Sequence, residues 1–222
     1  MMYFFNKLTK LISRKNLYKF IEQEINNILS KKKKIKILNV GSGGEIENFM
    51  KKNKKLELFS IDISKKRKPD LVYDISSTDI KNKIKFKPDI ITIFEVLEHV
   101  KNPSKAVQNI YKILKKNDVC ICSVPFNFHI HDEPNDFYRF TYYGLKYLFR
   151  NFKHVEIKKR NGWLESIFVN FVRLYFEKNF FSKFLGILFT ILYFILYPVI
   201  QLFQNIFVSN KLTTGYFVKA IK

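Results

Sequence analysis

The chain has 222 residues, of which 47% are hydrophobic; this is enough for one domain with an appendage and excludes a disordered protein. Its 40 Lys and Arg residues outnumber 19 Asp and Glu residues, so the formal net charge is +21. That charge indicates an anionic partner, either nucleic acid or an acidic membrane surface. A composition rich in Lys, Asn, Ile and Phe explains the same excess without any partner.

The N-terminal region, residues 1–34, is basic. Over residues 3–29 apolar side chains recur at helical spacing between Lys and Arg, which predicts an amphipathic helix. Two interpretations stay open: a helix packed on the following domain, or a helix at a membrane interface. The chain does not begin with the long apolar core of a signal peptide, so we expect it on the cytoplasmic side.

From residue 35 onward, short apolar segments alternate with helical ones, which indicates a doubly wound α/β sheet covered on both faces. We assign residues 35–162 to this core and residues 211–222 to its final strand. A ligand is expected at the carboxyl ends of the strands. Strands are predicted at residues 35–40, 56–61, 70–73, 89–94, 119–124, 154–158 and 213–221, and helices at 45–53, 104–115 and 142–149.

Two cysteines, Cys120 and Cys122, lie two residues apart in the fifth predicted strand. That spacing puts both side chains on one face of the strand and disfavours a disulfide between them. We therefore interpret them as small buried hydrophobic residues in a reducing compartment.

A glycine-rich turn, Gly41-Ser-Gly-Gly44, follows the first predicted strand directly. The next acidic residue at a strand end is Asp62, 21 residues after Gly41, where a doubly wound fold places a carboxylate against ribose hydroxyls. Glu45 occupies the place of a third glycine; its carboxylate repels phosphate and suits a cationic ligand better. The pattern predicts a nucleoside site rather than a dinucleotide site.

This arrangement resembles class I S-adenosylmethionine-dependent methyltransferases over about residues 35–160 and the final strand. Residues 88–100 are similar to ubiquinone-biosynthesis methyltransferases, and residues 129–141 to a bacterial group associated with surface-polysaccharide synthesis. The resemblance implies a Rossmann-like, mostly parallel sheet with an antiparallel last strand. It departs from the family at Asn39, where an acid is usual, and at Glu45.

The cofactor that the resemblance implies is S-adenosylmethionine, with Asp62 on the ribose and Asp74 on the adenine side. The departure at Asn39 is expected to weaken a contact near the methionine moiety without abolishing it. The residues that would contact the cofactor are Asn39, Gly41, Ser42, Gly43, Gly44, Asp62, Ile63, Asp74, Ile75 and Glu95.

Candidate acceptor-side residues follow the fourth and fifth strands: Glu95, His99, His131 and Arg139. In one reading His131 or His99 is a general base for a hydroxyl acceptor. In a second reading a divalent ion such as Mg²⁺ acidifies that hydroxyl, and Glu95, Glu98, His99 and His131 would hold it. In the third reading, which favours no metal, Glu95 contacts the cofactor and Glu98 and His99 cap the next helix.

Arg139 allows two interpretations. Its guanidinium can clamp an anionic acceptor, or it can pair with Asp136 three residues before it in the chain. We favour the structural pair.

Residues 163–210 form an apolar, aromatic insert between the last two strands, and residues 184–203 carry no charge over 20 residues. That length would span a bilayer, but a single crossing would separate two strands of one sheet. We expect an in-plane or re-entrant helical insert, bent near Pro198, that contacts an anionic membrane surface. An oligomer interface and a cap over the substrate pocket are the alternatives.

The sequence therefore predicts an O-methyltransferase that is peripheral or monotopic at the cytoplasmic membrane face and acts on a small-molecule, glycan or lipid-linked acceptor. A metal-assisted quinone or prenyl-lipid methyltransferase is an alternative within the same class. An RNA-binding protein or RNA methyltransferase is another, although no recognisable RNA-binding module is present. An inactive scaffold on this fold is a fourth alternative, and the oligomeric state is left open.

Overall fold

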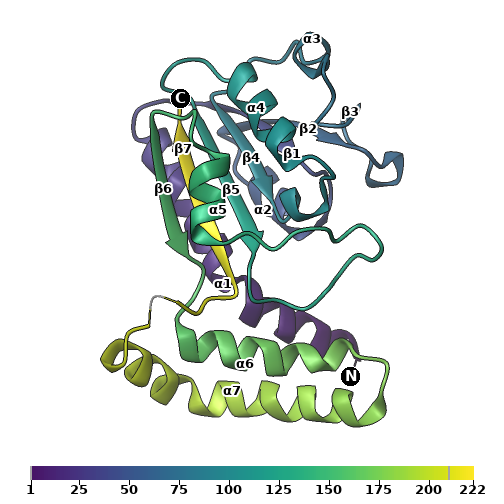
Figure 1. Ribbon diagram of the computed structural model, residues 1–222, viewed down its shortest axis with the longest axis vertical. Helices are drawn as coiled ribbons and strands as arrows, with labels where there is room; N and C mark the ends of the chain where they lie inside the picture. Colours follow the sequence, from purple (N-terminus) through teal and green to yellow (C-terminus); the bar gives the residue numbers. More distant parts are fainter. Residues whose placement is uncertain (1, 210) are drawn as a thin grey trace.

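The computed structural model of the protein describes residues 2–209 and 211–222 (Figure 1). Its centre is a seven-stranded sheet in the order β3-β2-β1-β4-β5-β7-β6. Neighbouring strands pair in parallel from β3 to β5, whereas β7 is antiparallel to both β5 and β6. The strands are β1 (Ile35–Val40), β2 (Leu56–Asp62), β3 (Leu71–Val72), β4 (Ile90–Phe94), β5 (Val119–Pro125), β6 (His154–Lys159) and β7 (Gly215–Ile221).

This topology confirms the predicted Rossmann-like sheet, including the antiparallel last strand. The predicted strand at residues 70–73 shrinks to Leu71–Val72, because the Asp70 carboxylate turns back to accept the backbone N–H of Ser60 at 2.7 Å. The last strand begins at Gly215 rather than at residue 213, because the backbone N–H of Thr214 donates to the side chain of Asn161 at 3.1 Å and not to a neighbouring strand.

Helices flank the sheet within a few residues of the predicted ranges, although the short α3 and the three 3₁₀ turns were not predicted. The start of α4 has two clear causes: Asn102 accepts the backbone N–H of Lys105 at 3.0 Å, and Pro103 stands at the first position. The helices are α1 (Met2–Leu29), α2 (Gly44–Lys51), α3 (Ile80–Lys83), α4 (Pro103–Ile113), α5 (Tyr142–Leu148), α6 (Trp163–Arg173) and α7 (Phe180–Ile206), with 3₁₀ turns η1 (Lys65–Arg67), η2 (Leu97–His99) and η3 (Leu174–Phe176).

The two faces of the sheet are covered by different helices. Helices α3, α4 and α5 pack on one face, where both cysteines lie buried and reduced. Helix α2 and the second half of α1 pack on the other face, where the ring of Phe20 stacks on that of Phe217 with centroids 4.6 Å apart. The second half of α1 is therefore a packing helix, as one of the two interpretations held.

The first half of α1 packs on a second layer formed by α6 and α7. Ile12 is buried there against Val169, Val172 and Tyr193. Figure 1 shows these two helices side by side beyond the carboxyl ends of β4 and β5. Gly186 lets α7 approach the preceding turn, because a Cβ at that position would stand 2.2 Å from the backbone nitrogen of Tyr175.

Helix α7 is long and apolar enough to cross a membrane by length and composition. It runs without interruption through Pro198. Because the α6–α7 hairpin connects β6 to β7, and these strands pair directly, a single crossing by α7 would tear the sheet apart. The fold therefore has the feature expected from the sequence: a helix long enough to span a membrane lies between two paired strands of one sheet.

The packing of α1 makes a stability prediction. Phe20→Ala removes a buried ring from the sheet face and should lower the free energy of unfolding by about 3–5 kcal/mol. Phe4→Ala, at a position of the same helix that is 59% exposed, should change it by less than about 0.5 kcal/mol. Urea denaturation followed by circular dichroism measures both; equal effects would contradict the packing of α1 on the domain.

Candidate active site

A cavity of about 840 Å³ opens at the carboxyl ends of β1, β2 and β4. Its walls come from the glycine-rich turn, the strand ends, the loop after β5, and also from α1, β6 and α6. All ten residues predicted to contact the cofactor line it, and so do His99 and His131. The structure thus brings the two predicted halves of the site, cofactor side and acceptor side, into one cavity.

The glycine-rich turn is shaped for close approach. Gly41 has φ of 89°, and a Cβ there would lie 2.4 Å from Cγ2 of Val96, so only glycine fits without displacing that side chain. The next backbone N–H, that of Ser42, donates to Oδ2 of Asp62 at 2.9 Å. The turn and the acid at the end of β2 are therefore fixed relative to each other.

Asp62 and its neighbour Ile63 form a platform suited to a nucleoside. The other carboxylate oxygen of Asp62 accepts the backbone N–H of Ser64 at 2.7 Å, which orients the group. Ile63 is 72% exposed although it is apolar, and it lines the cavity. Asp74 lies on the same wall and accepts the backbone N–H of Ser76 at 2.7 Å. Carboxylates for hydroxyl groups beside an apolar plate for a base match the predicted ligand type.

Glu47 is a site residue that the sequence analysis missed. It is buried one turn into α2, and its carboxylate accepts the backbone N–H of Gly43 at 2.6 Å and lies 3.3 Å from Nδ2 of Asn39. Burial alone would raise its pKa, but hydrogen bonds from Lys51 and Gly43 hold the pKa below its usual value. Glu47 therefore brings a negative charge to the place where Asn39 lacks one.

Glu95 has a structural partner that the sequence analysis did not foresee. Its Oε1 accepts the hydroxyl of Ser123 at 2.6 Å and is paired with the guanidinium of Arg160. Burial works to raise its pKa, but Arg160 and Ser123 hold the pKa below its usual value. The compact group of possible metal ligands comprises Glu98, His99 and His131 and does not include Glu95. The backbone of Glu95 has φ of 53°, a strained conformation at the cavity wall.

Glu98, His99 and His131 form a compact cluster whose donor atoms all lie within 4.8 Å of one another. Nε2 of His131 is 3.7 Å from Oε1 of Glu98, and Nδ1 of His99 meets the carbonyl of Asn135 at 2.8 Å. Glu98 is fully buried, and this burial raises its pKa. The expectation that Glu98 and His99 cap the next helix is wrong, because Asn102 caps it.

His131 has its pKa raised by its neighbours. Burial alone would lower that pKa, but the carboxylates of Glu98 and Asp136 outweigh the burial. Nδ1 of His131 lies 3.3 Å from Asp136, whose own pKa is held at about 2, mainly by Arg139, against the effect of burial. A half-buried imidazole between two carboxylates is suited to receive a proton.

Arg139 does not line the cavity. Its two guanidinium nitrogens bind the two carboxylate oxygens of Asp136 at 2.5 and 2.6 Å, and it also donates to the carbonyl of His129. The structural pairing is therefore the correct interpretation, and the role of an acceptor clamp is wrong. Arg139 braces the loop that carries His131.

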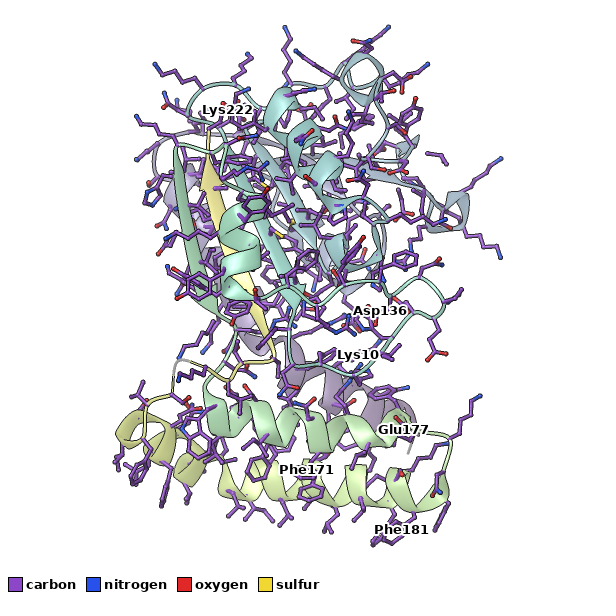
Figure 2. The ribbon with its side chains drawn as sticks, in the orientation of Figure 1. Lys10, Asp136, Phe171, Glu177, Phe181 and Lys222 are labelled. Carbon is purple, nitrogen blue, oxygen red and sulfur yellow. The ribbon has the colours of Figure 1, made fainter. Side chains whose placement is uncertain are left out.

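Cations from outside the Rossmann core also reach the cavity. Lys10 and Arg14 come from α1, and Arg173 comes from the last turn of α6. Figure 2 places Lys10 between the core and the helical layer, near Asp136. The only sequence signal for the first two is their spacing of four residues on one helix face; nothing local marks Arg173.

The comparisons agree with this geometry. A family model described as a methyltransferase domain matches residues 13–164. No curated protein matches the sequence. Solved structures with the same fold include a SAM-dependent methyltransferase from Archaeoglobus fulgidus, at 15% identity over 96% of this chain and 98% of that one, with a TM-score of 0.56.

The plantazolicin methyltransferase BamL, in a complex with SAH, is similar at 15% identity over 98% of this chain and 86% of that one, with a TM-score of 0.54. A putative sarcosine dimethylglycine methyltransferase from Galdieria sulphuraria is similar at 14% identity over 93% and 84%, also with a TM-score of 0.54. The chain belongs to the methyltransferase-domain family and is an S-adenosylmethionine-dependent methyltransferase.

Proposed function

We propose that this enzyme methylates a hydroxyl group of a glycan or lipid-linked acceptor at the cytoplasmic face of a membrane. The observation that carries the proposal is the exposed apolar face of the α6–α7 hairpin, because it belongs to the same helical layer that supplies Arg173 to the cavity.

The cofactor half of the cavity is acidic. Glu47, Asp62 and Asp74 line it together with the glycine-rich turn. S-adenosylmethionine, when bound, supplies a methyl group activated on a positively charged sulfur. Fixed carboxylates attract such a cation and orient it, and Ile63 offers an apolar surface to the adenine.

His131 is the proposed general base. It lines the cavity, where it would take the hydroxyl proton of an acceptor whose oxygen receives the methyl group as the bond from that group to sulfur breaks. Glu98 and Asp136 stabilise the resulting imidazolium, and Arg139 keeps Asp136 in place. His99, with a ring centroid 4.9 Å from that of His131, packs edge-on against the base.

The hairpin face is proposed to rest on the bilayer. In the most apolar stretch of α7 only 22% of the residues are buried, so most of the apolar side chains there are at least partly exposed. Exposed Lys178 and Lys183 stand at the start of this face, an arrangement that suits an anionic interface. The exposed apolar residues of α7 and its end include Phe180, Phe181, Phe184, Ile191, Ile195, Leu202, Ile206, Phe207 and Val208.

A second candidate is metal-assisted transfer to a quinone or prenyl-lipid hydroxyl, and the observation that favours it is the compact donor set. Glu98, His99 and His131 are the residues that would hold a divalent ion such as Mg²⁺. A bound ion would lower the pKa of a coordinated hydroxyl, which is the task otherwise given to His131.

Vesicle flotation tests the membrane assignment. The wild-type protein should float with vesicles of phosphatidylglycerol and phosphatidylcholine. Changing Phe180, Phe181 and Phe184 together to Ser should weaken the binding at least about tenfold, because each buried ring contributes about 1.5–3 kcal/mol. The matched control changes Tyr143 and Tyr147 to Ser, two exposed rings on α5 at a distance from the hairpin. Wild-type protein that stays at the bottom of the gradient would contradict the assignment.

The pH dependence of turnover tests the base. His131 must be neutral to act, and its neighbours raise its pKa, so kcat should rise with pH through a midpoint above the ordinary histidine value of about 6.5. His131→Asn should remove this limb and lower kcat about 10²–10⁴-fold, whereas His154→Asn, at an exposed position, should leave it unchanged. Loss of activity with EDTA that Mg²⁺ restores would favour the metal-assisted alternative instead.

A further inference from the structure

The cavity carries opposite charges in its two halves. Around the glycine-rich turn carboxylates outnumber the basic side chain of Arg67, which lies 3.9 Å from Asp62, whereas α1 and α6 contribute three cations: Lys10, Arg14 and Arg173. None of these cations belongs to the strands or loops that build the cofactor half. A cationic ligand explains the carboxylates near the glycine-rich turn. It does not explain the three cations from α1 and α6.

Arg173 is the clearest member of the cationic set. Its guanidinium lies 4.2 Å from the ring centroid of Phe176 and 5.0 Å from that of Phe128, and it contacts Nε2 of His129 at 3.0 Å. Within the part of the chain that the structure describes, no carboxylate pairs with it. Arg173 is half-buried, and Glu95, the carboxylate whose charge acts on it, is already paired with Arg160. A partly desolvated charge without a counter-charge of its own is unfavourable, so this position calls for an anion.

The surroundings of Arg173 support that reading. Burial and the positive charge of Arg14 lower the pKa of Arg173 to about 10, and the negative charge of Glu95 offsets only part of this effect. His129 offers no negative charge in return, because burial and Arg173 hold its pKa at about 3 and keep it neutral. Two like charges held together in this way indicate a missing anion between them.

The net charge of the set indicates which anion fits. Arg14 lies 3.6 Å from Glu45, whereas among the described residues Lys10 has no ion pair. Three cations and one carboxylate leave about two positive charges, which a phosphate or diphosphate group neutralises and a single carboxylate does not. Arginine forks match the geometry of phosphate oxygens.

The set also lies close to the proposed base. Phe128 joins them, since its ring centroid is 5.7 Å from that of His131 and 5.0 Å from the guanidinium of Arg173. An anion bound by Arg173 would therefore stand one side chain away from the methyl-accepting hydroxyl.

We propose that Lys10, Arg14 and Arg173 bind a phosphate or diphosphate group of the methyl acceptor. The inference rests on the proposed function only in that it places this group on the acceptor. It narrows the acceptor class to phosphorylated glycans and lipid-linked phosphates.

The test is calorimetric titration of inorganic phosphate and pyrophosphate into the full-length protein saturated with S-adenosylhomocysteine. Lys10→Ala and Arg173→Gln should each weaken pyrophosphate binding at least about tenfold, the loss of one charge-assisted contact. Lys7→Ala removes an exposed cation from the same helix and should change it less than about twofold. Binding of S-adenosylhomocysteine should be unchanged in all three variants, which shows that they are folded.

A second arm separates the two sources of phosphate. Phosphatidylcholine vesicles with and without phosphatidic acid present the group on a lipid, and a sugar 1-phosphate presents it in solution. If Lys10→Ala and Arg173→Gln weaken binding to phosphatidic acid but not to the sugar phosphate, the source is a lipid; the reverse result assigns a soluble acceptor.

Three results would overturn the inference: no binding of phosphate or pyrophosphate by protein that binds S-adenosylhomocysteine, binding of acetate as tight as that of phosphate, or an equal loss in Lys7→Ala. Each of these leaves the proposed function standing. Failure of S-adenosylhomocysteine to bind, with phosphate still bound, counts against the proposed function and not against the phosphate site.

Discussion

The antiparallel strand β7 is the constraint on which the rest of the structure depends. It inserts between β5 and β6, and its pairing with β6 runs from His154 opposite Ile221 to Lys159 opposite Tyr216. Since the α6–α7 hairpin connects these two strands, both of its ends are fixed to one edge of the sheet. Both ends of the hairpin must therefore lie on the same side of any membrane, next to the carboxyl ends of the parallel strands.

The same pairing positions the polar residues at the inner wall of the cavity. The backbone N–H of Arg160, directly after β6, donates to the carbonyl of Gly215 at 2.9 Å, which aims its side chain at Glu95. The side chain of Asn161 ties the start of β7 to the start of α6 through Thr214 and Ser166. The pairing of β7 with its neighbours therefore also determines where the residues on the acceptor side of the cavity lie.

Charge is distributed over the cavity in a way that the net value of +21 does not reveal. Acidic groups predominate around the glycine-rich turn within a strongly basic chain, and two added helices contribute cations to the same cavity. A positively charged cofactor and a negatively charged acceptor are then each attracted to a different half. The arrangement brings reactants of opposite charge together and favours the binding of each reactant in its own half of the cavity.

The fold and the cofactor half could be predicted because their signals are local. Strand periodicity, the turn at Gly41 and the acid at Asp62 each occupy a few consecutive residues, and the parallel sheet brings such strand ends together. The acceptor half depends on contacts between distant segments. Arg160 reaches Glu95 from 65 residues away, and Arg173 enters from a hairpin whose position β7 decides.

Glu47 shows a third kind of limit. Its residue type, on the first turns of a short helix, indicates only a solvated acid; its burial against Gly43 depends on how tightly the turn before it closes. Arg139 is the opposite case. Its local spacing from Asp136 correctly indicated the pair that the structure forms.

The central claim is that one cavity joins an S-adenosylmethionine site to a site for a phosphorylated acceptor at a membrane. The most direct measurement is incubation of the purified enzyme with methyl-labelled S-adenosylmethionine and membranes of its source cells, with Asp62→Ala as the inactive control. We expect label in membrane-bound material that is retained by an anion-exchange resin after extraction, and none with the control. Label confined to RNA or to neutral soluble compounds would contradict it.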